Sequence, residues 1–215
     1  MWTVLQLADS AFPTGGFAHS AGLEAAAQAG EVQGAESVKR FVHDAVWQAG
    51  WGALPLVRAA FEDPPALPRL DARAETFLVN QVANRASRTQ GRAFLATAAR
   101  VFPEQVGPLQ AQATGLKLHL APLWGVVCRA LDFSLDETQR VLLWNSARNV
   151  LSAAVRLGLV GTHEGQSMLA QLGPALDEVH RACGTLGIED LAQPAPLADL
   201  LQGTHDRLYS RLFQS

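Results

Sequence analysis

The stretch Ser134–Gly158, SLDETQRVLLWNSARNVLSAAVRLG, decides the fold class. Ser134 and Glu137 have the spacing at which a hydroxyl and a carboxylate cap the first turn of a helix. Apolar residues then recur at steps of three and four, which is typical of the buried side of a helix. We therefore expect a helix that ends at Gly158 and buries Val141, Trp144, Ala147, Leu151, Ala154 and Val155.

A polar row lies on another side of the same helix, at Asn145, Asn149, Ser152 and Arg156. Two asparagines and a serine have mediocre helix propensity, so the row needs an explanation. It is either an ordinary face in contact with water, which the spacing alone favours, or a surface kept polar for a partner.

The same patterns predict helices on both sides of this stretch, and no long alternating run indicates a β-sheet. We expect them at Ser20–Ala29, at Glu36–Phe61 with a break near Gly50 to Pro55, at about Ala72–Phe102, and from Thr162 and Pro174 onward. The alternating residues Leu116–Leu120 are interpreted as the end of a helix. The sequence predicts an all-α fold: a single domain, residues 1–215, built as a helical bundle of roughly eight to ten helices.

The composition excludes several classes of protein. Hydrophobic residues make up 48% of the 215 residues and charged residues 17%, so the chain can bury enough surface to fold. The net charge of −3 gives no electrostatic footprint for nucleic acid or for an anionic membrane. No stretch approaches the roughly 20 apolar residues of a membrane span, so we expect a cytoplasmic protein. Its two cysteines, Cys128 and Cys183, are expected to be reduced and buried.

Motifs of catalysis and of metal binding are missing. Neither lysine, Lys39 or Lys117, stands in a P-loop, and no GxGxxG motif opens a helix. The run His163–Ser167 starts like a zinc protease helix, but Ser167 occupies the place of the second histidine. The other histidines are scattered singly. We therefore expect no catalytic residue, no cofactor and no metal site.

Ser20 is the nearest candidate for a nucleophile. The run Ala18–Gly22, AHSAG, is similar to the G-x-S-x-G elbow of hydrolases, but its first glycine is replaced and no strand precedes it. We interpret Ser20 as the N-cap of the next helix, and a serine hydrolase remains as a remote alternative.

Two further clusters suit an interaction protein better than an enzyme. Gly15 and Gly16 form a turn before Phe17 and permit close approach of another chain. Arg85, Arg88 and Arg92 share one helix face, because they are three and four residues apart. Such arginines either meet water or face an acidic partner.

The run Leu5–Glu24, LQLADSAFPTGGFAHSAGLE, resembles the opening of the UreF family of urease accessory proteins. The resemblance continues at Asn84–Arg92, NRASRTQGR, with an Arg-x-x-Gly-Arg pattern, and at Ser152–Gly158. It closes with Gly165-Gln166 and with the tail His205–Ser215, and therefore covers essentially the whole chain.

Membership would imply an all-helical, commonly dimeric protein that bridges the accessory protein UreD (UreH in some species) and the GTPase UreG. It would modulate GTP hydrolysis while nickel is inserted into apo-urease, and would not be an enzyme. A nickel carrier that binds the ion itself is the alternative. The expected partner-binding residues are Gly15, Gly16, Phe17, His19, Ser20, Glu24, Arg85, Arg88, Arg92, Arg156, Arg207, Leu208, Tyr209, Arg211, Leu212 and Phe213.

The tail 204–215 is expected to be mobile in the free protein and to dock on UreD. Leu208, Tyr209, Leu212 and Phe213 would form an apolar stripe if the tail were helical. Arg207 and Arg211 would then aid capture through acidic contacts. The competing interpretation is a final helix packed permanently on its own core.

Overall fold

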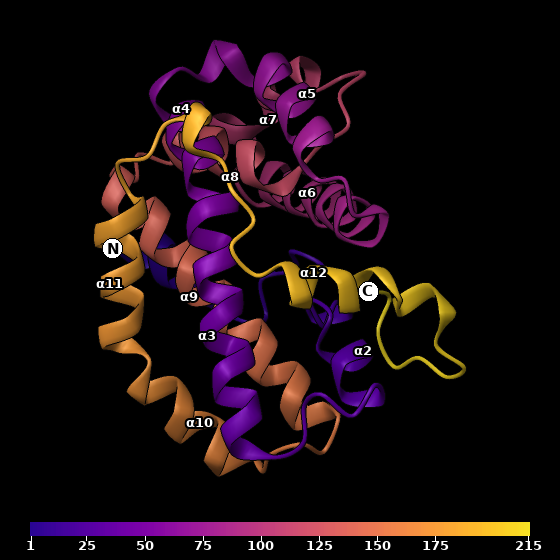
Figure 1. The fold of residues 1–215 in the computed structure, drawn as a ribbon. Coiled ribbons are helices and arrows are strands. Elements are labelled where there is room, and N and C mark those ends of the chain that lie inside the picture. Colours follow the sequence, from indigo (N-terminus) through magenta and orange to yellow (C-terminus); the bar gives the residue numbers. More distant parts are fainter.

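The computed structural model describes all 215 residues and contains helices but no strand, which confirms the all-α class (Figure 1). Twelve α-helices and four short 3-10 helices are present, because several expected helices are divided into shorter ones. The α-helices are α1 Trp2–Ala8, α2 Leu23–Gln28, α3 Ala35–Gly52, α4 Leu54–Glu62, α5 Leu67–Phe77, α6 Gln81–Val101, α7 Pro103–Gln112, α8 Leu120–Ala130, α9 Leu135–Arg156, α10 Thr162–Gln171, α11 Gly173–Cys183 and α12 Pro196–Gly203. The 3-10 helices are η1 Gly16–Ala18, η2 Pro64–Ala66, η3 Ile188–Asp190 and η4 His205–Arg207.

Helix α9 runs through the bundle and confirms the helix predicted from Ser134. Ser134 Oγ accepts a hydrogen bond from the Glu137 N–H at 3.2 Å, and Glu137 Oε2 accepts one from the Ser134 N–H at 2.8 Å. Helices α1, α3, α10 and α11 pack against α9. Val141, Ala147, Leu151 and Ala154 are buried as expected, whereas Trp144 and Val155 are half-buried.

The polar row of α9 is covered by the N-terminal segment of the same chain. Asn145 is only 9% exposed, and its Nδ2 donates a hydrogen bond to the Leu7 carbonyl at 3.1 Å. Arg156 donates a hydrogen bond to the carbonyl oxygen of Phe17. The favoured interpretation as a face in contact with water is therefore wrong for these two residues, because they supply polar partners to an irregular segment.

Two expected elements differ in the structure. The helix expected at Ala72–Phe102 is two helices, because Asn80 caps α6 by accepting hydrogen bonds from the Val82 and Ala83 N–H groups. The segment before Leu120 does not end a helix but is a loop in which Leu118 has a φ of +69°. The predicted break between α3 and α4 and the starts of α10 and α11 are confirmed.

A single cluster of buried apolar side chains extends through the bundle. At its centre the rings of Phe94 and Trp124 stack with their centroids 4.8 Å apart. Cys128 and Cys183 are both buried free thiols, as expected. Burial raises the pKa of Cys183 to about 11 and raises that of Cys128 further. None of the helices combines the length and the apolar character needed to cross a lipid bilayer.

Candidate partner-binding site

The tail 204–215 folds back onto α2 and onto the segment before it, at the side of the bundle where Figure 1 marks the C-terminal end. Beyond η4 it is irregular, so it is not the final helix of the competing interpretation, and the helix on which the apolar stripe depended is absent. The expected stripe is divided: Phe213 is buried, Leu208 is half-buried, and Tyr209 and Leu212 are exposed. Mobility of the free tail stays a prediction.

Glu24 holds the tail in place through hydrogen bonds. Its side chain is 3% exposed and accepts hydrogen bonds from the Leu212 N–H at 2.6 Å and the Phe213 N–H at 3.1 Å. His205 is fully buried, and its Nε2 lies 3.1 Å from the same carboxylate. A buried carboxylate needs such donors, because removing a charge from water is unfavourable without them. Glu24 is therefore an anchor of the tail rather than part of an exposed surface.

Ser20 and His19 bind the end of the tail. The Ser20 N–H and Oγ both donate to the main-chain oxygen of Ser215, at 2.6 and 2.9 Å. His19 Nδ1 lies 2.6 Å from Ser215 Oγ. Burial, followed by the nearby charge of Arg85, lowers the pKa of His19 to about 4.

The surroundings of Ser20 separate its two interpretations. The N-cap position of α2 is Gly22, but Ser20 Oγ accepts a hydrogen bond from the Glu24 N–H in the first turn of α2 at 3.3 Å, as the capping interpretation expected. Ser20 is also fully buried, and the imidazole of His19 is hydrogen-bonded to Ser215 instead of to Ser20. A hydrolase nucleophile must reach a substrate and a base, so the serine hydrolase alternative has no support at this residue.

Arg156 joins the first turn to the tail. Its guanidinium carbon lies 3.8 Å from the ring centre of Phe17 and 4.3 Å from that of Phe213. Cation–π contacts of this kind add attraction beyond apolar burial. Phe17 is nevertheless 67% exposed, so one aromatic ring remains on the surface beside the tail.

The three arginines of α6 have different surroundings. Arg85 forms a two-pronged ion pair with Asp206 of η4, at 2.7 and 3.1 Å. Arg88 lies 3.7 Å from Glu75 of α5, and Arg92 is exposed and contacts Thr89. Arg85 and Arg88 therefore have carboxylate partners within the chain, and Arg92 has none.

The Arg-x-x-Gly-Arg pattern also has a packing role at its glycine. A Cβ at Gly91 would lie 1.9 Å from the carbonyl oxygen of Leu118, so only glycine permits the loop before α8 to cross α6 here. Asp71 accepts hydrogen bonds from the N–H groups of Lys117 and His119, at 2.6 and 2.8 Å. These contacts hold the loop that precedes α8 in place against α5 and α6.

The buried histidine of this loop was not predicted from the sequence. His119 is fully buried, with Nε2 2.8 Å from Glu75 Oε2 and Nδ1 3.1 Å from Ser87 Oγ. The hydrogen bonds from His119 and from Asn84 hold the pKa of Glu75 below its usual value. No spacing in the sequence indicates this set, because Ser87 and Glu75 lie 32 and 44 residues before His119.

The expected partner-binding residues thus divide into three groups. Gly16, His19, Ser20, Glu24 and Phe213 are buried, whereas Gly15, Arg88, Arg156 and Leu208 are half-buried. The exposed members are Phe17, Arg85, Arg92, Arg207, Tyr209, Arg211 and Leu212. No three His, Cys, Asp or Glu side chains lie together in a way that could hold a metal ion.

Comparison with known proteins gives full-length relatives. The family model UreF matches residues 32–173. Urease accessory protein F of Oryza sativa subsp. indica is 38% identical over 220 residues, which cover 99% of this chain and 84% of the relative. The protein of the same name from Arabidopsis thaliana is 36% identical and covers 100% and 92% of the two chains. Urease accessory protein UreF of Roseobacter denitrificans is 30% identical, with 99% and 93% covered. The chain belongs to the UreF family of urease accessory proteins.

Proposed function

We propose that the chain is a helical adaptor that bridges UreD (UreH) and the GTPase UreG and modulates GTP hydrolysis during nickel insertion into apo-urease. It acts in the cytoplasm as a homodimer and carries out no chemistry of its own. Membership of a family of urease accessory proteins supports the general role.

One observation supports the position of the UreD-binding surface. Tyr209 is fully exposed, Leu212 is 54% exposed and Phe17 is 67% exposed, all on the tail or on the turn that contacts it. Arg207 and Arg211 are exposed on the same tail. Aromatic and apolar side chains with arginines at their edge are typical of the residues that dominate protein–protein affinity.

Capture by purified UreD and UreG from the same genome tests this proposal. Replacing both Tyr209 and Leu212 by alanine should weaken UreD binding about tenfold or more, because each side chain gains roughly 1.5 to 3 kcal/mol on full burial. Trp2 and Leu5 of α1 form a matched exposed pair, at 77% and 56%. Their replacement by alanine should leave capture unchanged.

The GTPase part of the proposal has its own measurement. The rate of GTP hydrolysis is measured for UreG alone and for UreG mixed with the complex of this chain and UreD. A change in the rate is expected only when UreG binds that complex. Equal capture by the Tyr209 and Leu212 variant and by the unchanged chain would refute the position of the surface. An unchanged hydrolysis rate in a formed complex would refute the modulation.

A further inference from the structure

A cleft of about 380 Å³ lies between the turn Gly15–Phe17, helix α9 and the start of α10. Its lining contains two arginines of α9, Arg148 and Arg156, and no aspartate or glutamate. The other polar side chains of the lining are neutral hydroxyls and amides, namely Ser10, Thr14, Asn149, Ser152, Thr162 and Gln166. The cleft therefore carries two positive charges, in a chain whose net charge is −3.

Neither of these arginines forms a salt bridge within the chain. Arg148 donates a hydrogen bond to the Ala8 carbonyl and Arg156 donates one to the Phe17 carbonyl, and all their acceptors are uncharged oxygen atoms. Burial lowers the pKa of Arg148, and the charge of the exposed Asp9 offsets this only in part. A guanidinium group has five N–H donors, so each arginine keeps donors and a full charge for another group.

The turn Gly15–Phe17 adds main-chain donors to the same cleft, since all three of its residues line it. Gly15 has a φ of +76°, in the left-handed region, and is followed directly by the right-handed helix η1. Successive N–H groups in such a turn form a concavity that binds anions. The N–H groups of Gly15 and Phe17 have no hydrogen-bond partner in the chain, and that of Gly16 makes only a long bond of 3.4 Å to Thr14 Oγ1.

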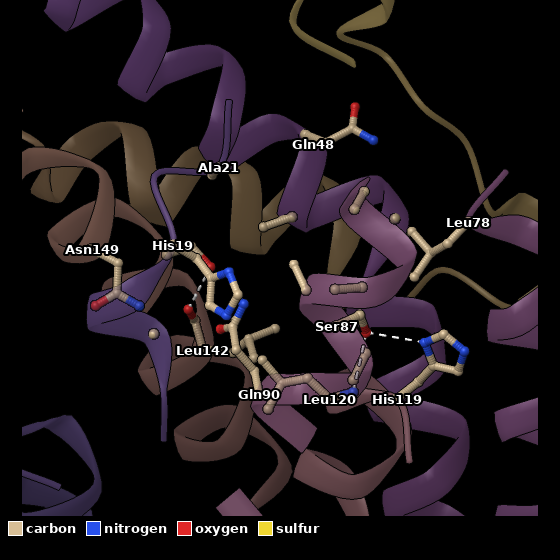
Figure 2. A pocket seen from close by; sticks show the side chains of 18 of the residues that line it. His19, Ala21, Gln48, Leu78, Ser87, Gln90, His119, Leu120, Leu142 and Asn149 are labelled. Carbon is tan, nitrogen blue, oxygen red and sulfur yellow. Dashed lines mark hydrogen bonds between the residues drawn. The ribbon is translucent and has the colours of Figure 1, made fainter. Parts of the chain in front are cut away.

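Asn149 brings this turn and α9 together. A Cβ at Gly16 would lie 2.6 Å from Asn149 Nδ2, so the absence of a side chain at Gly16 lets the amide approach the main chain closely. Figure 2 shows the Asn149 side chain beside the indigo N-terminal segment. Arg148, Ser152 and Arg156 follow one another at steps of four residues and therefore share one face of α9. The N–H groups of the turn and the guanidinium groups of α9 thus border one space.

We propose that this cleft is a binding site for a doubly charged oxyanion of the phosphate class. The N–H groups of Gly15 and Phe17 bind its oxygen atoms from one side, and Arg148 and Arg156 neutralise its charge from the other. A singly charged anion would leave one guanidinium without a counter-charge, and a cation would be repelled by both. The volume lies at the lower end of small-molecule sites, which is roughly 300 Å³, so the ligand is small.

An NMR titration of the isolated, ¹⁵N-labelled full chain with potassium phosphate at pH 8 tests the site. Saturable shifts are expected for the amides of Gly15, Gly16 and Phe17, with potassium chloride of equal ionic strength as the blank. Acetate, which carries one charge, should bind about tenfold more weakly or less tightly still. Glycerol 3-phosphate is the second phosphate probe: tighter binding than that of phosphate would identify a phosphate ester as the ligand, and equal binding would identify the free ion.

The variants Arg148→Gln and Arg156→Gln should each weaken phosphate binding about tenfold or more, the loss expected when a charge-assisted hydrogen bond is removed. Arg73→Gln is the matched control, because Arg73 is an exposed arginine of α5 outside the cleft. This variant should bind phosphate as the unchanged chain does. Circular dichroism and the amide signals of α5 check that each variant is folded.

A third variant keeps the test decisive, since both arginines also contact carbonyl groups of the chain. The Ser152 side chain lines the cleft, and Ser152→Ala should fold normally and weaken phosphate binding about threefold, the loss of one neutral hydrogen bond. Absence of saturable shifts with phosphate would overturn the proposal. Equal affinity for phosphate and acetate, or unchanged affinity in all three variants, would overturn it as well. The experiment contains no partner protein, so its result is independent of the proposed adaptor function.

Discussion

Gly91 of α6 and Leu118 of the loop before α8 are in direct main-chain contact, with the Leu118 carbonyl oxygen 1.9 Å from where a Cβ would lie at residue 91. That oxygen belongs to the backbone and cannot rotate away. Leu118 itself has a φ of +69°, in the left-handed region, so the loop is already constrained. A helix and a loop 27 positions apart in the sequence therefore fit together only if residue 91 has no side chain.

The first prediction is that Gly91→Ala destabilises the protein by roughly 2 to 4 kcal/mol. Alanine would gain up to about 1 kcal/mol in helix propensity, but overpacking against the main chain outweighs that gain. Guanidinium chloride denaturation measures the difference.

Gly203→Ala is the control for this change, because the nearest atom to its added Cβ would be 3.8 Å away. Its free energy of unfolding should change by about 0.5 kcal/mol or less. Similar stability of the two variants would contradict the contact between Gly91 and Leu118.

The second prediction separates two arginines of the same cluster. Arg88→Glu places a second carboxylate beside Glu75, which also contacts the buried His119. Stability should fall by roughly 1 to 3 kcal/mol. Arg92→Glu, one helical turn further along on the exposed surface, should change stability by about 0.5 kcal/mol or less.

Complex formation is the second readout for these variants. If Arg92 faces an acidic partner, Arg92→Glu should weaken assembly with UreD and UreG by about 1 to 3 kcal/mol while the fold is unchanged. Unchanged assembly would show that Arg92 meets only water. Unchanged stability of Arg88→Glu would contradict the role of Arg88 beside Glu75.

The sequence was sufficient for those parts of the fold that depend on neighbours in the chain. Helix α9 could be predicted because its capping residues, Ser134 and Glu137, and its apolar stripe lie within one segment. The break before α6 was missed, although Asn80 is a common capping residue, because the apolar pattern continues on both sides. The side-chain cap of Asn80 starts a new helix there, even though the apolar periodicity alone predicts one continuous helix.

The site was less predictable, since its contacts are long-range. Glu24 came into the candidate set only through the family resemblance, and its partners Leu212 and Phe213 are 188 and 189 residues away. The tail was expected to be mobile in the free protein, and its apolar residues, four apart, would have formed a stripe only if the tail were helical. Main-chain hydrogen bonds to Glu24 instead hold it in an irregular conformation, and no local pattern encodes them.

The third prediction concerns the pH dependence of stability. The ordinary pKa of histidine is 6.5, and in the folded protein that of His19 is lowered to about 4. The unfolded chain therefore binds more protons than the folded one between these values, and stability decreases as the pH falls from 6.5 to 4. The expected loss from His19 is roughly 1 to 3 kcal/mol.

Denaturation curves at pH 7, 6, 5 and 4.5 test this prediction by comparison with His19→Gln. The neutral amide does not titrate, so the variant should lose less stability over the same range. His43→Gln removes a histidine whose side chain is 53% exposed and should follow the unchanged chain. Parallel curves for the chain and for His19→Gln would contradict the prediction.

The last prediction is that Glu24→Gln loosens the tail while the helical core stays folded. The carboxylate accepts hydrogen bonds from two backbone N–H groups and from His205, whereas a carboxamide has one acceptor oxygen and turns its NH₂ group toward one of those donors. Losing one or two bonds to a charged acceptor should speed hydrogen exchange at the amides of Leu212 and Phe213 by roughly 10- to 1,000-fold. Amides of α9 should keep their protection, and Glu31→Gln, at an exposed position seven residues along, should leave the tail unchanged. If the tail exchanges rapidly in the unchanged chain, Glu24 does not hold it in the free protein, and the tail becomes ordered only on its partner.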